Sequence, residues 1–148
     1  MADIPYKQPV SVLVVVHTAD LDVLLLERAD HPGYWQSVTG SVEEGESLRA
    51  TAMRELGEET GLKKGRLLDW EMETEYEIYP EWRHRYAPGV TTNTEHVFGF
   101  RLDEPVPVTL SAREHLNYLW LPFMEAANKV FSSSNASAIL KLPEMRYQ

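Results

Sequence analysis

The chain has 148 residues, of which 43% are hydrophobic and 25% are charged, as expected for an ordinary globular domain. Its formal net charge of −9 argues against non-specific binding to nucleic acid or to an anionic membrane surface, so a phosphate ligand would need a metal ion or a few placed cations. The absence of cysteine excludes disulfides and thiol chemistry.

Residues 1–148 are expected to form a single domain with no membrane span. The longest apolar run, Val12 to Val16, is too short to cross a bilayer. The N-terminal residues MADIPYKQPV lack a basic region followed by an apolar signal core. We therefore expect a cytoplasmic protein with neither a membrane nor a nucleic-acid partner, and the composition leaves its oligomeric state open.

The first part of the chain predicts two strands and a helix. Val10 to His17 is a β-branched run typical of a strand buried on both faces, and Val23 to Arg28 predicts its hairpin partner. Ser47 suits the N-cap of a helix, and Gly61 suits the left-handed position that ends it. The core-facing positions of that helix recur at helical spacing. They are Leu48, Ala52, Met53 and Leu56.

The second part of the chain predicts three more strands and two short helices. The strands are expected over 67–79, 91–102 and 116–121, and the helices over 122–129 and 136–142. Pro80 ends the first of these strands, and Pro122 suits the first position of a helix. Ser132 to Asn135 is expected to be a cap-rich loop before the final helix.

The stretch from Gly40 to Leu62 contains six glutamates, and three of them fall within about one turn of the predicted helix. Like charges at Glu55 and Glu59 repel by roughly 0.2–0.5 kcal/mol, and Gly57 in the same helix costs about 1 kcal/mol relative to Ala. Mg²⁺ would remove the repulsion, because it takes carboxylate oxygens and keeps waters for a phosphate substrate. The alternative interpretation is a solvated acidic helix face.

The spacing within this stretch resembles the Nudix box. The matching positions are Gly40, Glu46, Arg54-Glu55-Leu56, Glu58-Glu59 and Gly61-Leu62. The resemblance implies an α/β/α sandwich with a mixed sheet and a pyrophosphohydrolase that depends on Mg²⁺, with Mn²⁺ as a substitute. One departure is that Val38-Thr39-Gly40 stands where most Nudix boxes have Pro-Gly-Gly.

The resemblance also implies roles for individual residues. Glu55 and Glu59 would be metal ligands, and the Gly40 carbonyl would be a further ligand. Arg54 and Glu46 would orient the carboxylates through a salt bridge.

Two other glutamates, Glu58 and Glu114, each have more than one candidate role. Glu58 would be a metal ligand or the general base that takes a proton from the attacking water. Glu114 lies in a polar loop before the last predicted strand and is the other candidate base. The resemblance favours Glu114 as a metal ligand, and its alternative is a solvated loop residue.

The sequence Val38-Thr39-Gly40 and its flanking segments resemble those of the bacterial dihydroneopterin triphosphate pyrophosphatases of folate biosynthesis. The flanking matches are Lys7 and Pro9, Trp35–Glu46, Arg83–Val90, Asn93–Glu95 and Glu114–His115. This resemblance implies hydrolysis of a small-molecule triphosphate to a monophosphate and pyrophosphate. One alternative is a hydrolase that removes (d)NTPs or oxidised nucleotides, and a remote one is a Nudix-fold ligand sensor without catalysis.

A triphosphate joined to a flat heterocycle needs fixed cations and an aromatic surface. The candidate phosphate-binding residues are Lys7, Arg28 and either Arg83 or Arg85, with surface salt bridges as the alternative. The candidate stacking residues are Trp35, Tyr76 and Tyr79, with core packing as the alternative for Trp35 and Tyr79. Thr39 and Ser132 are candidate polar contacts to the rest of the substrate.

Overall fold

The computed structural model describes residues 6–147, so residues 1–5 and 148 of the expected domain lie outside it. Within that range, β1 (Val10–Thr18) and β6 (Thr92–Leu102) pair in parallel at the centre of a seven-stranded sheet. The other strands are β2 (Asp22–Arg28), β3 (Trp35–Gln36), β4 (Val38–Ser41), β5 (Arg66–Glu77) and β7 (His115–Pro122). Their pairings are antiparallel, so the sheet is mixed.

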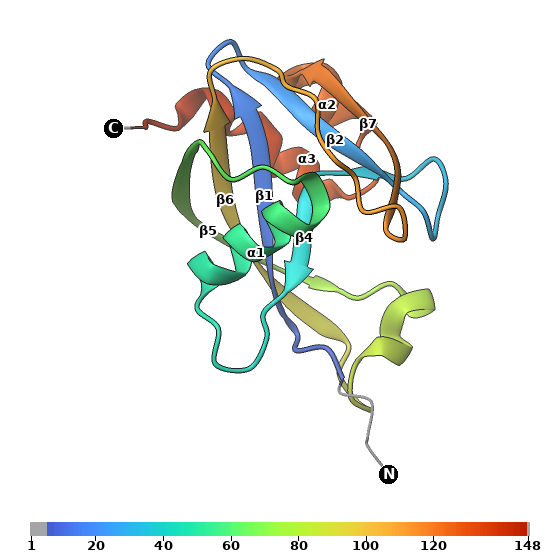
Figure 1. Cartoon of the computed structure of the whole chain (residues 1–148). Coiled ribbons are helices and arrows are strands. Elements are labelled where there is room, and N and C mark those ends of the chain that lie inside the picture. The colour runs from blue at the N-terminus through green and yellow to red at the C-terminus, as the bar shows by residue number, and fades with distance from the viewer. Residues whose placement is uncertain (1–5, 148) are drawn as a thin grey trace.

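Helices cover both faces of this sheet, as Figure 1 shows. The helix α1 (Leu48–Thr60) lies on one face, and α2 (Phe123–Lys129) and α3 (Ser133–Leu140) lie on the other. Two 3₁₀ segments, η1 (Pro80–Arg85) and η2 (Leu142–Glu144), complete the regular structure of residues 6–147. The expected α/β/α sandwich is therefore confirmed. No helix in the described range is long and apolar enough to cross a membrane.

The strand β1 is buried on both faces, as its β-branched run predicts. Val12 and Val14 belong to the core on the side of α1, where they pack with Leu56. Leu13 and Val15 belong to the second core, with Ile139 of α3. Because successive side chains of a strand point to opposite faces, a strand between two helical layers needs apolar residues at every position.

Both ends of α1 lie where the sequence predicts them. The Ser47 hydroxyl accepts a hydrogen bond from the backbone N–H of Ala50 at 3.1 Å. Gly61 has a φ of 74°, and its N–H donates to the carbonyl of Gly57 at 2.9 Å. These caps set the register of the glutamates relative to the sheet.

The expected start of the last helix was wrong by three residues. The structure begins α3 at Ser133, and Ser132 is its N-cap, with its hydroxyl accepting from the Asn135 N–H at 3.4 Å. The serines assigned to a loop therefore form the first helical turn, since the first serine of the run satisfies the cap.

The sheet forks at β1, and this fork positions the site. Ser11 to Val14 pair with β4, whereas His17 pairs with Val23 of β2. The strands β4 and β2 therefore separate and leave a gap in the sheet. Glu59 of α1 reaches this gap, because it lines the same cavity as Leu13, whose side chain lies on the opposite face of the sheet.

Candidate active site

The helix α1 and the strand β4 approach closely at Gly40. A Cβ atom at Gly40 would overlap the carboxyl group of Glu55. Glu55 is only 9% exposed and Glu59 only 2% exposed. The glycine thus allows the carboxylate of Glu55 to be held against the backbone of β4.

Arg54 organises the acidic side chains around this contact. Its Nε and Nη2 donate to the two carboxylate oxygens of Glu46 at 2.7 and 2.9 Å. Its Nη1 donates to Glu55 at 2.6 Å, and its Nη2 also donates to the carbonyl of Ser41 at 3.1 Å. The hydrogen bonds from Arg54 hold the pKa of Glu46 at about 2. The ion pair that the Nudix resemblance implies is therefore present.

Glu59 is buried, and the described residues compensate its charge only weakly. Within the described residues, neither of its carboxylate oxygens makes a hydrogen bond of good geometry. Burial, followed by the neighbouring Glu55 and the charge of Glu114, raises its pKa well above the ordinary value. The Nε2 atom of His115 lies 3.6 Å from Glu59, but burial lowers the pKa of that imidazole to about 4. His115 is therefore neutral near pH 7 and does not balance the charge.

Glu114 lies within electrostatic reach of the acidic residues of α1. Partial burial and the charges of Glu55 and Glu58 raise the pKa of Glu114, whereas Lys7 and Arg28 lower it. The loop before β7 thus brings a third carboxylate toward the same site.

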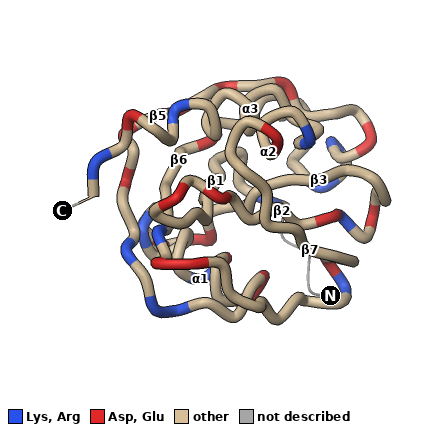
Figure 2. Tube along the Cα trace, turned by 90° about the horizontal axis from the view of Figure 1, so that it is seen from above, with Lys and Arg blue, Asp and Glu red and all other residues tan. Residues whose placement is uncertain are grey.

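The donor set fits a hard divalent cation. An unpaired buried carboxylate is unfavourable unless a cation or a proton compensates it, and Glu59 is such a group. Among residues 6–147, no three His, Cys, Asp or Glu side chains are already placed to hold a metal ion together. Figure 2 shows how acidic positions gather along α1. The metal ligands accordingly remain predictions, supported by the unpaired carboxylate.

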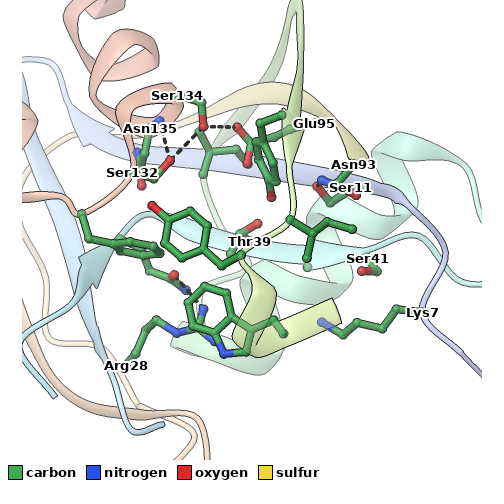
Figure 3. A pocket seen from close by; sticks show the side chains of 18 of the residues that line it. Lys7, Ser11, Arg28, Thr39, Ser41, Asn93, Glu95, Ser132, Ser134 and Asn135 are labelled. Carbon is green, nitrogen blue, oxygen red and sulfur yellow. Dashed lines mark hydrogen bonds between the residues drawn. The ribbon is translucent and has the colours of Figure 1, made fainter. Parts of the chain in front are cut away.

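A cavity of about 670 Å³ opens from this acidic site, and Figure 3 shows part of its lining. The predicted site residues that line it are Lys7, Arg28, Thr39, Gly40, Glu59, Tyr76, Tyr79, Arg85, Glu114 and Ser132. The structure therefore brings together residues that are more than 120 positions apart in sequence.

Two arginines and a lysine provide positive charge in the cavity. Arg28 donates to both carboxylate oxygens of Asp30 at 2.7 Å each, and Arg85 donates to the same group at 3.3 Å. Lys7 is exposed as a whole residue, yet desolvation of its ammonium and the charge of Arg85 lower its pKa. These cations are suited to phosphate oxygens.

One wall of the cavity is aromatic. The rings of Tyr79 and Trp82 stack with centroids 5.3 Å apart, and the ring of Phe131 meets both edge-on at 5.9 and 6.1 Å. The guanidinium of Arg28 lies 4.4 Å from the centroid of the Trp82 ring. The sequence analysis missed Trp82 and Phe131 as lining residues. The available signal was the basic and aromatic run Trp82-Arg83-His84-Arg85 in an otherwise acidic chain.

The sequence analysis also missed a polar group formed by β1, β6 and the start of α3. Glu95 is 4% exposed, and burial raises its pKa to about 7. The Asn93 amide donates to the Ser11 hydroxyl at 2.7 Å. Tyr76 lies beside these two side chains, and burial raises its pKa. The signal was the alternation Asn93, Glu95 in a predicted strand, which places both residues on one face.

Other predicted site residues lie outside the cavity lining. Trp35 packs against the core of α2 and α3, and the Lys129 ammonium lies 5.2 Å from its ring centroid. Arg83 donates to the carbonyl of Ile78 at 3.0 Å, so Arg85 is the arginine of this pair that faces the cavity. Glu58 is exposed on α1, 3.4 Å from Arg54.

A profile of the NUDIX domain matches residues 7–142, which is most of the chain. Together with the sandwich fold and the acidic helix against Gly40, this match shows that the chain belongs to the Nudix family. Enzymes of this family generally need a divalent metal ion.

The chain is similar to dihydroneopterin triphosphate diphosphatases of two bacteria. It is 46% identical to the Escherichia coli (strain K12) protein over 94% of this chain and 95% of that one. It is 41% identical to the Haemophilus influenzae protein over 92% of this chain and 88% of that one. The solved structure of the E. coli dihydroneopterin triphosphate pyrophosphohydrolase superposes with a TM-score of 0.87, at 46% identity over 92% of this chain and 95% of that chain.

Proposed function

We propose that the chain hydrolyses dihydroneopterin triphosphate to dihydroneopterin monophosphate and pyrophosphate, as a cytoplasmic enzyme of folate biosynthesis formed by one domain over 1–148. The observation that carries this proposal is the buried carboxylate of Glu59, which makes no hydrogen bond of good geometry within residues 6–147 and lines a cavity with cationic side chains and an aromatic wall. The near full-length similarity to proteins named for this activity supports the choice of substrate.

We propose Mg²⁺ as the cofactor, with Mn²⁺ as a substitute. Glu55, Glu59, Glu114 and the Gly40 carbonyl would hold it, and Glu58 would be a further ligand or the base. When bound, the ion supplies neutralisation of the phosphate oxygens and a lower pKa for an attacking water.

Side chains of the protein bind the triphosphate, position the metal ligands and accept the proton. Lys7, Arg28 and Arg85 bind the oxygens of the triphosphate. Arg54 holds Glu55 in place through the contacts described above, and Glu46 fixes Arg54. The base, Glu58 or Glu114, accepts the proton of the attacking water.

The direct test mixes the purified protein with Mg²⁺ and dihydroneopterin triphosphate and identifies the phosphate product. We expect pyrophosphate rather than three orthophosphates. In the Glu59→Gln variant, hydrolysis should fall by at least about a hundredfold while the fold is retained, because a metal ligand is lost. The control is Glu44→Gln, which removes an exposed charge from the same acidic stretch.

The aromatic wall also favours a second candidate, a pyrophosphohydrolase of (d)NTPs or oxidised nucleotides, because such a surface accepts a purine as readily as a pterin. Turnover of 8-oxo-dGTP without turnover of dihydroneopterin triphosphate would replace the first proposal with this one. Measured hydrolysis of either substrate would eliminate a sensor without catalysis.

A further inference from the structure

The cavity is polarised along its length. In Figure 3, Lys7 and Arg28 lie at one end, Glu95 and Ser134 lie at the other, and Thr39 lies between them. Cations at the first end suit a phosphate chain. A carboxylate at the other end is unsuited to phosphate, so a different part of the ligand must face it.

The described residues compensate the buried carboxylate of Glu95 only in part. Within the described residues, its carboxylate accepts one hydrogen bond, from the Ser134 hydroxyl at 3.2 Å. Among the ion pairs of residues 6–147, none includes Glu95. A carboxylate that is 4% exposed and has a single neutral donor is costly unless a ligand supplies further donors.

The sheet aims this carboxylate into the cavity. Glu95 of β6 stands opposite Ser11 of β1, and Ser11 stands opposite Ser41 of β4, so the three residues form one row across the sheet. Asn93 lies two residues before Glu95 and therefore on the same face. The Oδ1 atom of Asn93 is a buried acceptor without a partner in the described residues. The far end of the cavity thus presents more acceptors than the donors around it satisfy.

We propose that Glu95 recognises the edge of the bound heterocycle on which a ring N–H stands beside an amino group, the 2-amino-4-oxopyrimidine edge shared by pterins and guanine. The inference rests on the proposed function and names the specificity determinant of the same cavity. The two carboxylate oxygens match two adjacent donors, as a carboxylate matches a guanidinium. Adenine offers a ring acceptor at the corresponding position, which a carboxylate repels.

The first test uses the wild-type protein and measures binding rather than turnover. The probes are α,β-methylene analogues of GTP and ITP, which differ only in the 2-amino group, and dissociation constants are measured by calorimetry. We expect the GTP analogue to bind roughly tenfold or more tightly, the discrimination typical of a bidentate contact. The proposal is overturned if the GTP analogue binds no better than the ITP analogue.

The second test replaces Glu95 by Gln, whose side chain offers one donor and one acceptor. The preference for the GTP analogue over the ITP analogue should fall to near unity. The α,β-methylene analogue of ATP should bind the variant better than it binds the wild type, because an amide matches the adenine edge. The control is Glu73→Gln, whose exposed side chain lies opposite His96, next to Glu95 in β6. An unchanged preference in Glu95→Gln would overturn the proposal.

The two proposals fail in different experiments. If the wild type releases no pyrophosphate from dihydroneopterin triphosphate, the proposed function is wrong, whatever the binding preference. If it releases pyrophosphate but binds the GTP and ITP analogues equally, the function stands and the role of Glu95 is wrong.

Discussion

Glu55, Glu59 and Glu95 are the buried carboxylates of the described residues, and each faces the candidate site. Glu55 has an arginine partner, whereas Glu59 has none and Glu95 has only a hydroxyl. Groups of this kind reduce the stability of a metal-free, ligand-free protein. Buried titratable groups of this kind are typical of binding and catalytic sites.

Glu95 gives a prediction for the pH dependence of stability. Burial raises its pKa from 4.5 to about 7, so the folded state binds this proton more tightly than the unfolded state. Its stabilising contribution is therefore complete below about pH 4.5 and is lost as the pH rises through about 7. This difference in pKa between the folded and unfolded states corresponds to about 3 kcal/mol of folding stability.

The Glu95→Gln variant should remove this dependence, since an amide does not titrate. Urea unfolding in EDTA should show the variant more stable than the wild type by up to about 3 kcal/mol near pH 8, with the advantage vanishing near pH 4.5. Parallel stability profiles for the two proteins would show that Glu95 is not the titrating group.

Arg54 gives a second prediction at the scale of one residue. Its guanidinium bonds Glu46, Glu55 and the Ser41 carbonyl at once, which a lysine ammonium cannot reproduce. Arg54→Lys should therefore lower kcat/KM by roughly 10–100-fold, as is typical for residues that orient metal ligands. Arg49→Lys, at an exposed position of the same helix, is the matched control and should leave kcat/KM unchanged.

At the scale of elements, alanine substitutions at two glycines between Gly40 and Leu62 are expected to have different effects on the protein. Gly57 lies inside α1 with open space where a Cβ would be, so Gly57→Ala should stabilise the protein by roughly 0.4–1 kcal/mol and leave the fold intact. Gly40→Ala should lower activity, because the new methyl group would displace the carboxyl group of Glu55 from its place beside β4.

Urea unfolding and kcat/KM, measured on both variants, check this pair. A Gly40→Ala protein with wild-type activity would contradict the close contact between β4 and α1. A destabilised Gly57→Ala protein would contradict the open space on α1.

At the scale of the whole molecule, the net charge of −9 and the unpaired carboxylates predict stabilisation by a divalent cation. A Mg²⁺ concentration of about 100 times Kd should stabilise the fold by about 2.7 kcal/mol. That gain corresponds to a rise in Tm of roughly 5–10 °C for a domain of this size.

Thermal unfolding with Mg²⁺ and with EDTA measures this rise, and NaCl at equal ionic strength controls for screening of the net charge. Glu59→Gln should lose most of the shift. A shift of equal size in NaCl would mean that the cation acts through general screening and not at a site.

The sequence alone determined the elements and the acidic helix. Periodic apolar residues, a serine cap and a terminal glycine are local signals, and they placed β1 and both ends of α1 correctly. The box spacing likewise indicated the Nudix family, since its positions lie in one continuous stretch from Gly40 of β4 through α1. The start of α3 was missed because four adjacent cap residues offered several possible N-caps.

The tertiary structure alone decided which residues face the cavity. Glu95 and Ser134 meet because β6 pairs with β1 and the start of α3 lies over that pair, a contact between residues 39 positions apart. The same long-range packing places Trp35 against the core. It also places Arg85, rather than Arg83, in the lining of the cavity. Local periodicity shows that a side chain leaves one face of a strand, but only the pairing of distant strands determines what that face meets.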